Sequence, residues 1–135
     1  MKRNSFAFLL PALLILVSSC RGIETDDPIL CYQKWAHELP PRDVHVMKGH
    51  YWHSGLWAKD DEVYLIMKSE RNWWSAFIYQ NGLIPDSSAW IPSSGKPGWF
   101  NPPSRTKNWK NPKSNSESYY MMDSLYQIIY IHEVK

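Results

Sequence analysis

The segment Ile84–Ser118 constrains the fold of this chain more than any other stretch. Its 35 residues include six prolines, eight serines and two glycines, a composition that favours neither helix nor strand. Irregular stretches longer than about 12–15 residues are uncommon in compact domains, and disordered stretches are usually poor in aromatic residues. The large rings of this segment are Trp90, Trp99, Phe100 and Trp109. We therefore expect residues 84–100 to be ordered and held against the domain by their aromatic side chains, and residues 104–118 to be more mobile.

Before this segment, the apolar pattern predicts a helix and then a hairpin. Residues 30–39 have helical spacing and stop at two prolines. Residues 43–53 are rich in Val, Tyr and Trp, which predicts a strand, and Gly49 is a candidate for a bulge within it. Residues 62–68 alternate between two faces and predict a second strand. The polar residues 58–61 between them are expected to form the turn.

From Ser69 onward the apolar period changes from two to about 3.6, which predicts a second helix. Ser69 is the expected N-cap, and Gly82 is expected to end the helix as a glycine C-cap. Residues 119–122 and 125–134 predict a closing hairpin, whose second strand is apolar on both faces and therefore interior. The predicted fold is α+β: a small antiparallel sheet of two hairpins, a central helix packed on it, and a long irregular segment rich in Pro and Trp.

The first 20 residues predict secretion. Lys2 and Arg3 precede the apolar run 6–17, which is too short to span a hydrocarbon core of about 30 Å, since that needs roughly 20 residues. The stretch Leu16-Val17-Ser18-Ser19-Cys20 resembles the lipobox of bacterial lipoproteins. This resemblance implies cleavage before Cys20 and attachment of lipid to its thiol.

The resemblance also implies a division of the chain. Residues 1–19 are the expected signal peptide, residues 20–29 a lipidated tether, and residues 30–135 a single small domain. Two or more acyl chains hold a protein stably on a bilayer, so a lipid bilayer is the first expected partner. Arg21 follows the cysteine, where many enterobacterial lipoproteins kept in the inner membrane have Asp. By analogy with that pattern, we expect the bacterial cell envelope and, within it, the outer membrane.

Lipidation of Cys20 would leave Cys31 without an intramolecular disulfide partner. The leading interpretation of Cys31 is a buried structural thiol, followed by an intermolecular disulfide. If Cys20 is not lipidated, a bridge between the two cysteines becomes the natural alternative.

The charge balance excludes a nucleic-acid partner. Removal of Lys2 and Arg3 with the signal lowers the 15 basic side chains to 13, equal to the 13 acidic ones. Nucleic-acid binders usually show a strong basic excess or a basic stripe.

The sequence contains no convincing catalytic motif. Residues 93–96 match the serine–x–x–lysine pattern of penicillin-interacting enzymes, but Gly95 and Pro97 disfavour the helix that this chemistry requires. Cys31 lacks the Asp-Cys-Ser-Gly context of cell-wall Cys/His peptidases. Residues 60–62 are acidic but belong to the predicted turn, where a solvated role is expected. We therefore expect no enzymatic activity and no cofactor.

The histidines do not predict a metal site. His45, His50 and His53 lie within nine residues. On a strand, His45 and His53 share a face but lie about 26 Å apart at roughly 3.3 Å per residue. His50 points the opposite way, so we expect surface or hydrogen-bonded histidines and no metal.

The rings of the proline-rich segment are the remaining functional candidates. These rings can cover a thin hydrophobic core. Alternatively, one or two of them can stay exposed beside basic residues, an arrangement that is common in binding hot spots. Trp109 is the best candidate for an exposed ring.

We expect a non-catalytic protein-binding module that contacts an envelope protein through this aromatic and basic surface. The alternatives are a lipoprotein that binds glycan such as peptidoglycan, and an immunity-type lipoprotein that neutralises an envelope toxin. The expected partner-binding residues are Trp90, Trp99, Phe100, Arg105, Trp109 and Lys110.

Overall fold

A computed structural model describes residues 22–55, 60–114 and 117–135. The lipobox-like residues, Cys20 and part of the expected turn at residues 58–61 lie outside this described part.

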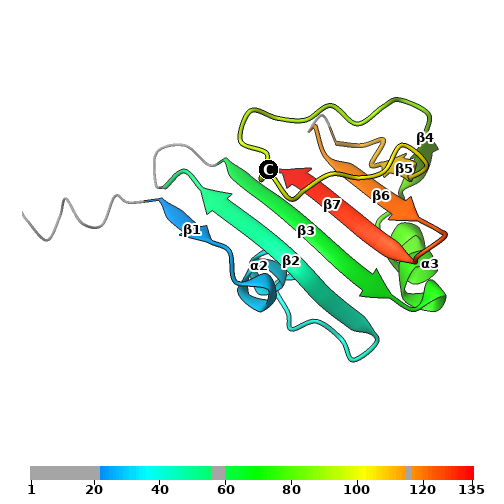
Figure 1. Ribbon diagram of the computed structural model, residues 1–135, viewed down its shortest axis with the longest axis horizontal. Coiled ribbons are helices and arrows are strands. Elements are labelled where there is room, and N and C mark those ends of the chain that lie inside the picture. Colours follow the sequence, from blue (N-terminus) through cyan, green and yellow to red (C-terminus); the bar gives the residue numbers. More distant parts are fainter. Residues whose placement is uncertain (1–21, 56–59, 115–116) are drawn as a thin grey trace, which may run out of the picture.

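Within the described residues, seven strands form one antiparallel sheet in the order β1-β2-β3-β7-β6-β5-β4 (Figure 1). The strands are β1 (Ile23–Thr25), β2 (Val44–His53), β3 (Asp61–Ser69), β4 (Ile84–Asp86), β5 (Lys107–Lys110), β6 (Tyr119–Asp123) and β7 (Ile128–Val134). The helices are α2 (Pro28–Ala36) and α3 (Arg71–Gln80). Neither described helix is long and apolar enough to cross a membrane.

The expected α+β fold, with a small sheet of two hairpins and a central helix, is wrong. The β2–β3 and β6–β7 hairpins do form, but β3 pairs with β7 and merges them into one sheet. Strands β4 and β5 come from the segment that we expected to be irregular, and β5 lies in the part expected to be more mobile. Strand β1 and the start of α2 lie in residues 20–29, so the ordered domain begins before Leu30. Strands of three or four residues are too short to show a period of two.

The sheet is covered on both faces, which explains its apolar pattern. Val63, Leu65 and Met67 of β3 contribute to a core beneath α2 and α3. Tyr64 and Ile66 point the other way, into a second core that residues 87–106 cover. The alternation predicted for this strand is confirmed. The interior position predicted for the last strand is also confirmed, because β7 lies between β3 and β6.

Helix α2 packs closely on β2 at a glycine. A Cβ atom on Gly49 would lie 2.7 Å from Cys31 Cβ, so only glycine admits the helix there. The irregularity in β2 falls between Val46 and Lys48, which corrects the bulge expected at Gly49. Cys31 is fully buried, and burial raises the pKa of its thiol to about 12. The buried-thiol interpretation of Cys31 is confirmed.

The start of α3 differs from the prediction, and its end agrees. Ser69 is the last residue of β3, and Glu70 occupies the N-cap position without a capping side-chain hydrogen bond. Gly82 has a positive φ of 59°, and the Leu83 amide donates to the Ile78 carbonyl at 3.0 Å. This is the Schellman arrangement expected of a glycine C-cap.

Candidate functional site

The aromatic residues predicted to bind a partner lie in two separate cores. Trp90 and Trp99 pack against the core on the face opposite the helices, where Phe100 is fully buried. Trp109 instead packs against the core beneath the helices, with its ring edge-to-face with Trp74 at 5.3 Å. Trp109 is therefore half-buried, and these rings do not form one surface.

The two predicted basic residues are engaged in ion pairs. The Arg105 guanidinium binds the buried Asp123 carboxylate with two nitrogens, at 2.6 and 3.0 Å, and lies over the Tyr126 ring. Lys110 Nζ lies 3.6 Å from Asp86 Oδ1. These contacts tie the proline-rich segment and its neighbours together, so the structure gives both side chains a role within the domain.

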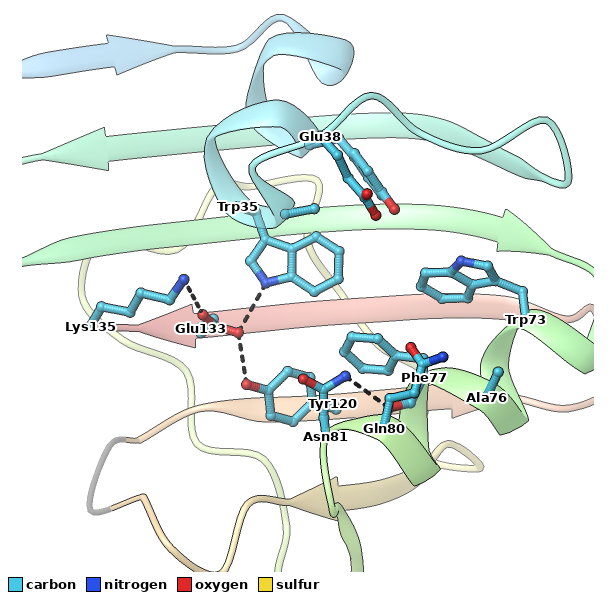
Figure 2. Close-up of a pocket in the computed structure, with 12 residues that line it drawn as sticks. Trp35, Glu38, Trp73, Ala76, Phe77, Gln80, Asn81, Tyr120, Glu133 and Lys135 are labelled. Atoms are coloured by element: carbon cyan, nitrogen blue, oxygen red, sulfur yellow. Dashed lines mark hydrogen bonds and ion pairs between the residues drawn. The ribbon is translucent and has the colours of Figure 1, made fainter.

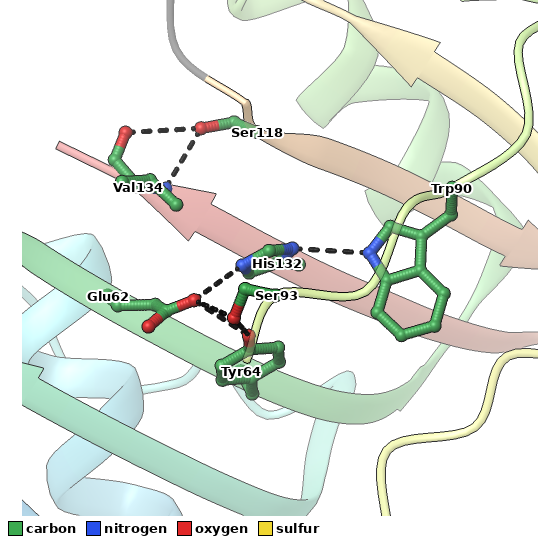
Figure 3. A network of polar contacts seen from close by, with 7 residues as sticks. All are labelled: Glu62, Tyr64, Trp90, Ser93, Ser118, His132 and Val134. Carbon is green, nitrogen blue, oxygen red and sulfur yellow. Dashed lines mark hydrogen bonds and ion pairs between the residues drawn. The ribbon is translucent and has the colours of Figure 1, made fainter. Parts of the chain in front are cut away.

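A polar network fixes the proline-rich segment to the sheet (Figure 3). The carboxylate of Glu62 accepts hydrogen bonds from the hydroxyls of Tyr64 and Ser93, each at 2.7 Å, and from His132 Nε2 at 2.9 Å. Burial alone would raise the pKa of Glu62, but these hydrogen bonds lower it below its ordinary value. The solvated turn role expected for Glu62 is therefore corrected.

His132 completes this network and is only 2% exposed. Its Nδ1 accepts a hydrogen bond from Trp90 Nε1 at 3.2 Å, so the proton of the neutral ring lies on Nε2, which faces Glu62. Burial lowers the pKa of His132, and its ring stacks on Tyr64 at 4.3 Å. Both ring nitrogens are occupied, and Ser93 donates to the Glu62 carboxylate. The network therefore links the proline-rich segment to β3 and β7.

Two further histidines pair with nearby carboxylates. His50 Nδ1 lies 2.6 Å from Asp26 Oδ1, and His53 pairs with Asp61. Among the described residues, no group of three His, Cys, Asp or Glu side chains is arranged to hold a metal ion.

A cleft of about 450 Å³ opens between α2 and α3 on the helical face of the sheet (Figure 2). We call it the α2–α3 cleft. Trp35 of α2 forms one wall, and Trp73 and Phe77 of α3 form the other. Tyr120 of β6 and Glu133 of β7 form the floor. Other polar side chains that line the cleft are Glu38, Gln80, Asn81 and Lys135.

Glu133 holds two rings of the cleft, those of Trp35 and Tyr120, in place. Its Oε2 accepts hydrogen bonds from Trp35 Nε1 at 2.9 Å and from the Tyr120 hydroxyl at 2.7 Å, and its Oε1 pairs with Lys135 Nζ at 2.9 Å (Figure 2). Burial, followed by the charge of Glu133, raises the pKa of Tyr120. The Trp35 wall and the Tyr120 part of the floor are therefore preorganised.

The arrangement of the rings defines what the cleft can bind. The Trp73 and Phe77 rings are nearly parallel, with centroids 5.3 Å apart, and the Trp35 ring is tilted against Phe77 at 5.5 Å. Amide side chains of Gln80 and Asn81 line the same space. Such a cleft suits a ligand that offers both an apolar face and hydrogen-bonding groups.

Sequence reasoning missed this cleft. One signal was present in the last strand, where Glu133 follows Ile129 and Ile131 on the same face. A charged side chain in line with two core residues is unusual unless it is paired or hydrogen-bonded. The partners of Glu133, however, could not be identified without the tertiary structure.

Comparison of the chain with protein-family models, with curated proteins and with solved structures finds no match. The chemistry of the cleft is therefore the basis for a functional proposal.

Proposed function

We propose that this protein is a lipid-anchored lipoprotein of the bacterial cell envelope, at the outer membrane, and that its domain is a non-catalytic module that binds glycan in the α2–α3 cleft. The anchor rests on the lipobox-like stretch ending at Cys20. The binding function rests on one observation: aromatic rings from two helices face a shared space that also contains amide and carboxylate side chains.

The chemistry of a sugar matches this lining. One face of a pyranose ring presents C–H groups that pack on aromatic rings, and its edge presents hydroxyls that bond to amides and carboxylates. Trp73 and Phe77 are half-buried, so part of each ring is accessible to a ligand. Gln80 and Asn81 supply donors and acceptors beside them. A few directed polar groups in a ring-lined cleft are typical of small-ligand sites.

Two observations favour glycan over the alternatives. A protein partner requires a contiguous apolar patch, but the rings expected to form it are divided between two cores. Catalysis by the carboxylate on the floor of the cleft would require it to reach a substrate. Instead, Trp35, Tyr120 and Lys135 occupy the oxygens of Glu133. Binding without chemistry fits this geometry best.

Titration of the full chain, held in detergent micelles, with soluble N-acetylglucosamine oligomers tests this proposal. Trp73→Ala is expected to weaken binding at least tenfold, which is about 1.4 kcal/mol, because it removes the larger of the two rings that form one wall of the cleft. Tyr79→Ala is the matched control, since Tyr79 lies on the same helix, is 88% exposed and does not line the cleft. Circular dichroism of both variants checks that the fold is retained.

Two outcomes would contradict the proposal. Equal loss in both variants, or none in either, would remove the cleft from the binding site. Failure to bind any glycan, combined with capture of a defined envelope protein or toxin by the same chain, would instead establish the protein-binding alternative.

A further inference from the structure

A second groove adjoins the α2–α3 cleft at the C-terminal end of α2. It has a volume of about 590 Å³, and we call it the α2 groove. Its lining includes Gln33, Lys34, His37, Glu38, Tyr51 and Asp61. Glu38 lines both the groove and the cleft. The space between them that Trp35, Tyr51 and Asp61 line is only about 10 Å³, too small for a ligand. The two cavities instead adjoin at Glu38, which gives one path around the end of the helix.

The two parts of this path differ in chemistry. The cleft contains the stacked rings, whereas the α2 groove is lined mainly by polar and charged side chains. Asp61 is already engaged, because it accepts a hydrogen bond from Tyr51 at 3.0 Å and pairs with His53. Within the described part of the chain, neither Lys34 nor Glu38 takes part in an ion pair, and both are exposed. The groove thus offers one available cation and one available anion.

The position of these charges at a helix end adds to their effect. Helix α2 ends at Ala36, and the C-cap His37 adopts the left-handed conformation. The last carbonyl groups of a helix carry a partial negative charge, which reinforces Glu38 as a site for an ammonium group. Lys34, one turn earlier on α2, is suited to a carboxylate. A ligand that follows this path would therefore meet rings first and then charges of both signs.

We propose that the ligand is a glycan that carries a short peptide with both a carboxylate and an ammonium group. This inference rests on the glycan-binding function proposed above. The sugar occupies the α2–α3 cleft, and the peptide runs along the α2 groove. Its carboxylate faces Lys34, and its ammonium group faces Glu38.

The test compares two ligands that differ only in the peptide. The full chain in detergent micelles is titrated with the disaccharide of N-acetylglucosamine and N-acetylmuramic acid. The disaccharide is either bare or bears a tetrapeptide that has a free carboxylate and a free ammonium group. Tryptophan fluorescence reports binding. The peptide-bearing form is expected to bind about tenfold more tightly. Lys34→Gln should reduce this advantage at least threefold and leave affinity for the bare disaccharide unchanged, because Lys34 does not line the cleft. Glu38→Gln should also reduce the advantage at least threefold. Lys68→Gln is the control, because Lys68 is exposed on β3 and lines none of these cavities.

The possible outcomes separate this inference from the proposed function. Equal affinity for both disaccharides, with dependence on Trp73 retained, would overturn the peptide proposal and leave glycan binding in place. Tighter binding of the peptide-bearing form that is insensitive to both Lys34→Gln and Glu38→Gln would overturn the assignment of the α2 groove. Failure of every sugar ligand to bind would overturn the proposed function itself.

Discussion

The indole N–H of Trp35, in the first described helix, donates a hydrogen bond to Glu133 Oε2, in the last strand, at 2.9 Å. The two residues are 98 positions apart in sequence. The hydroxyl of Tyr120 donates to the same oxygen at 2.7 Å. One carboxylate therefore joins α2, β6 and β7 beneath the α2–α3 cleft.

This relationship predicts a large loss of stability for Glu133→Ala. The substitution would leave the buried donors of Trp35 and Tyr120 without an acceptor, and each orphaned donor costs about 1–3 kcal/mol. Glu133→Gln keeps an acceptor oxygen and should lose less. Urea denaturation of both variants measures the difference, with Glu117→Ala, an exposed acidic position, as control. Equal stability of wild type and Glu133→Ala would contradict the role assigned to this carboxylate.

The close approach of α2 to β2 predicts a selective effect at Gly49. Gly49→Ala places a methyl group 2.7 Å from Cys31 Cβ, nearer than such atoms approach one another. Overpacking of this kind typically costs about 1–3 kcal/mol. In the described surroundings of Gly98, an added Cβ has nothing within 4 Å, so Gly98→Ala is the matched control. Thermal unfolding should show a lower midpoint for Gly49→Ala alone, and a shift of equal size at both positions would refute the packing argument.

The buried His132 predicts that stability falls in mild acid. Burial lowers the pKa of His132 below 6.5 in the folded state, so the unfolded chain binds a proton first as the pH falls. Its contribution to stability is therefore complete above about pH 6.5 and is lost as the pH falls through the folded-state pKa. The slope from one proton is at most about 1.4 kcal/mol per pH unit.

Denaturation midpoints between pH 7.5 and pH 5 measure this effect. His132→Gln should flatten the pH dependence, because the titrating ring is gone, whereas replacement of the exposed His45 by Gln should leave it unchanged. An unaltered slope in His132→Gln would assign the acid sensitivity to other groups.

The proposed anchor predicts that Cys20 is required for membrane attachment. Cells that express the full chain should incorporate a labelled fatty-acid precursor into it, and Cys20→Ser should abolish the label and release the protein from the membrane fraction. Cys31→Ser keeps the lipobox-like stretch intact and should retain the label. Label that persists in Cys20→Ser would disprove lipidation at that position.

The elements that could be predicted are those whose pattern is local. Helix α3 shows a full apolar stripe and a glycine stop, and strands β2 and β3 are long enough to display alternation. Strands β1, β4 and β5 have three or four residues each. So short a stretch carries no period, and β4 even contains Pro85, which is tolerated there because β4 is an edge strand. Only pairing with a neighbour makes these residues strands.

The candidate site, too, could be predicted from the sequence only where the pattern is local. Sequence reasoning identified a ring-rich segment but placed its function on Trp109, which the structure packs against Trp74. The ring of Trp73 belongs to the apolar stripe that predicts this helix, and it both packs against the core and lines the α2–α3 cleft. Whether a ring on a helix faces a core or a cavity depends on how far the next helix lies, and a periodic pattern does not contain that distance.

By itself, the sequence of this protein determined the strongly periodic elements, the buried state of Cys31, and the lipobox-like stretch from which an anchor is proposed. These features depend on residues close together in the sequence and on the burial of apolar side chains away from water. The tertiary structure alone decided that β3 pairs with β7, that β4 and β5 extend the sheet, and that Trp35 and Glu133 meet at the base of a cleft. These contacts join residues far apart in the chain. Their stabilising energy is gained only after the strands have paired and the intervening loops have closed.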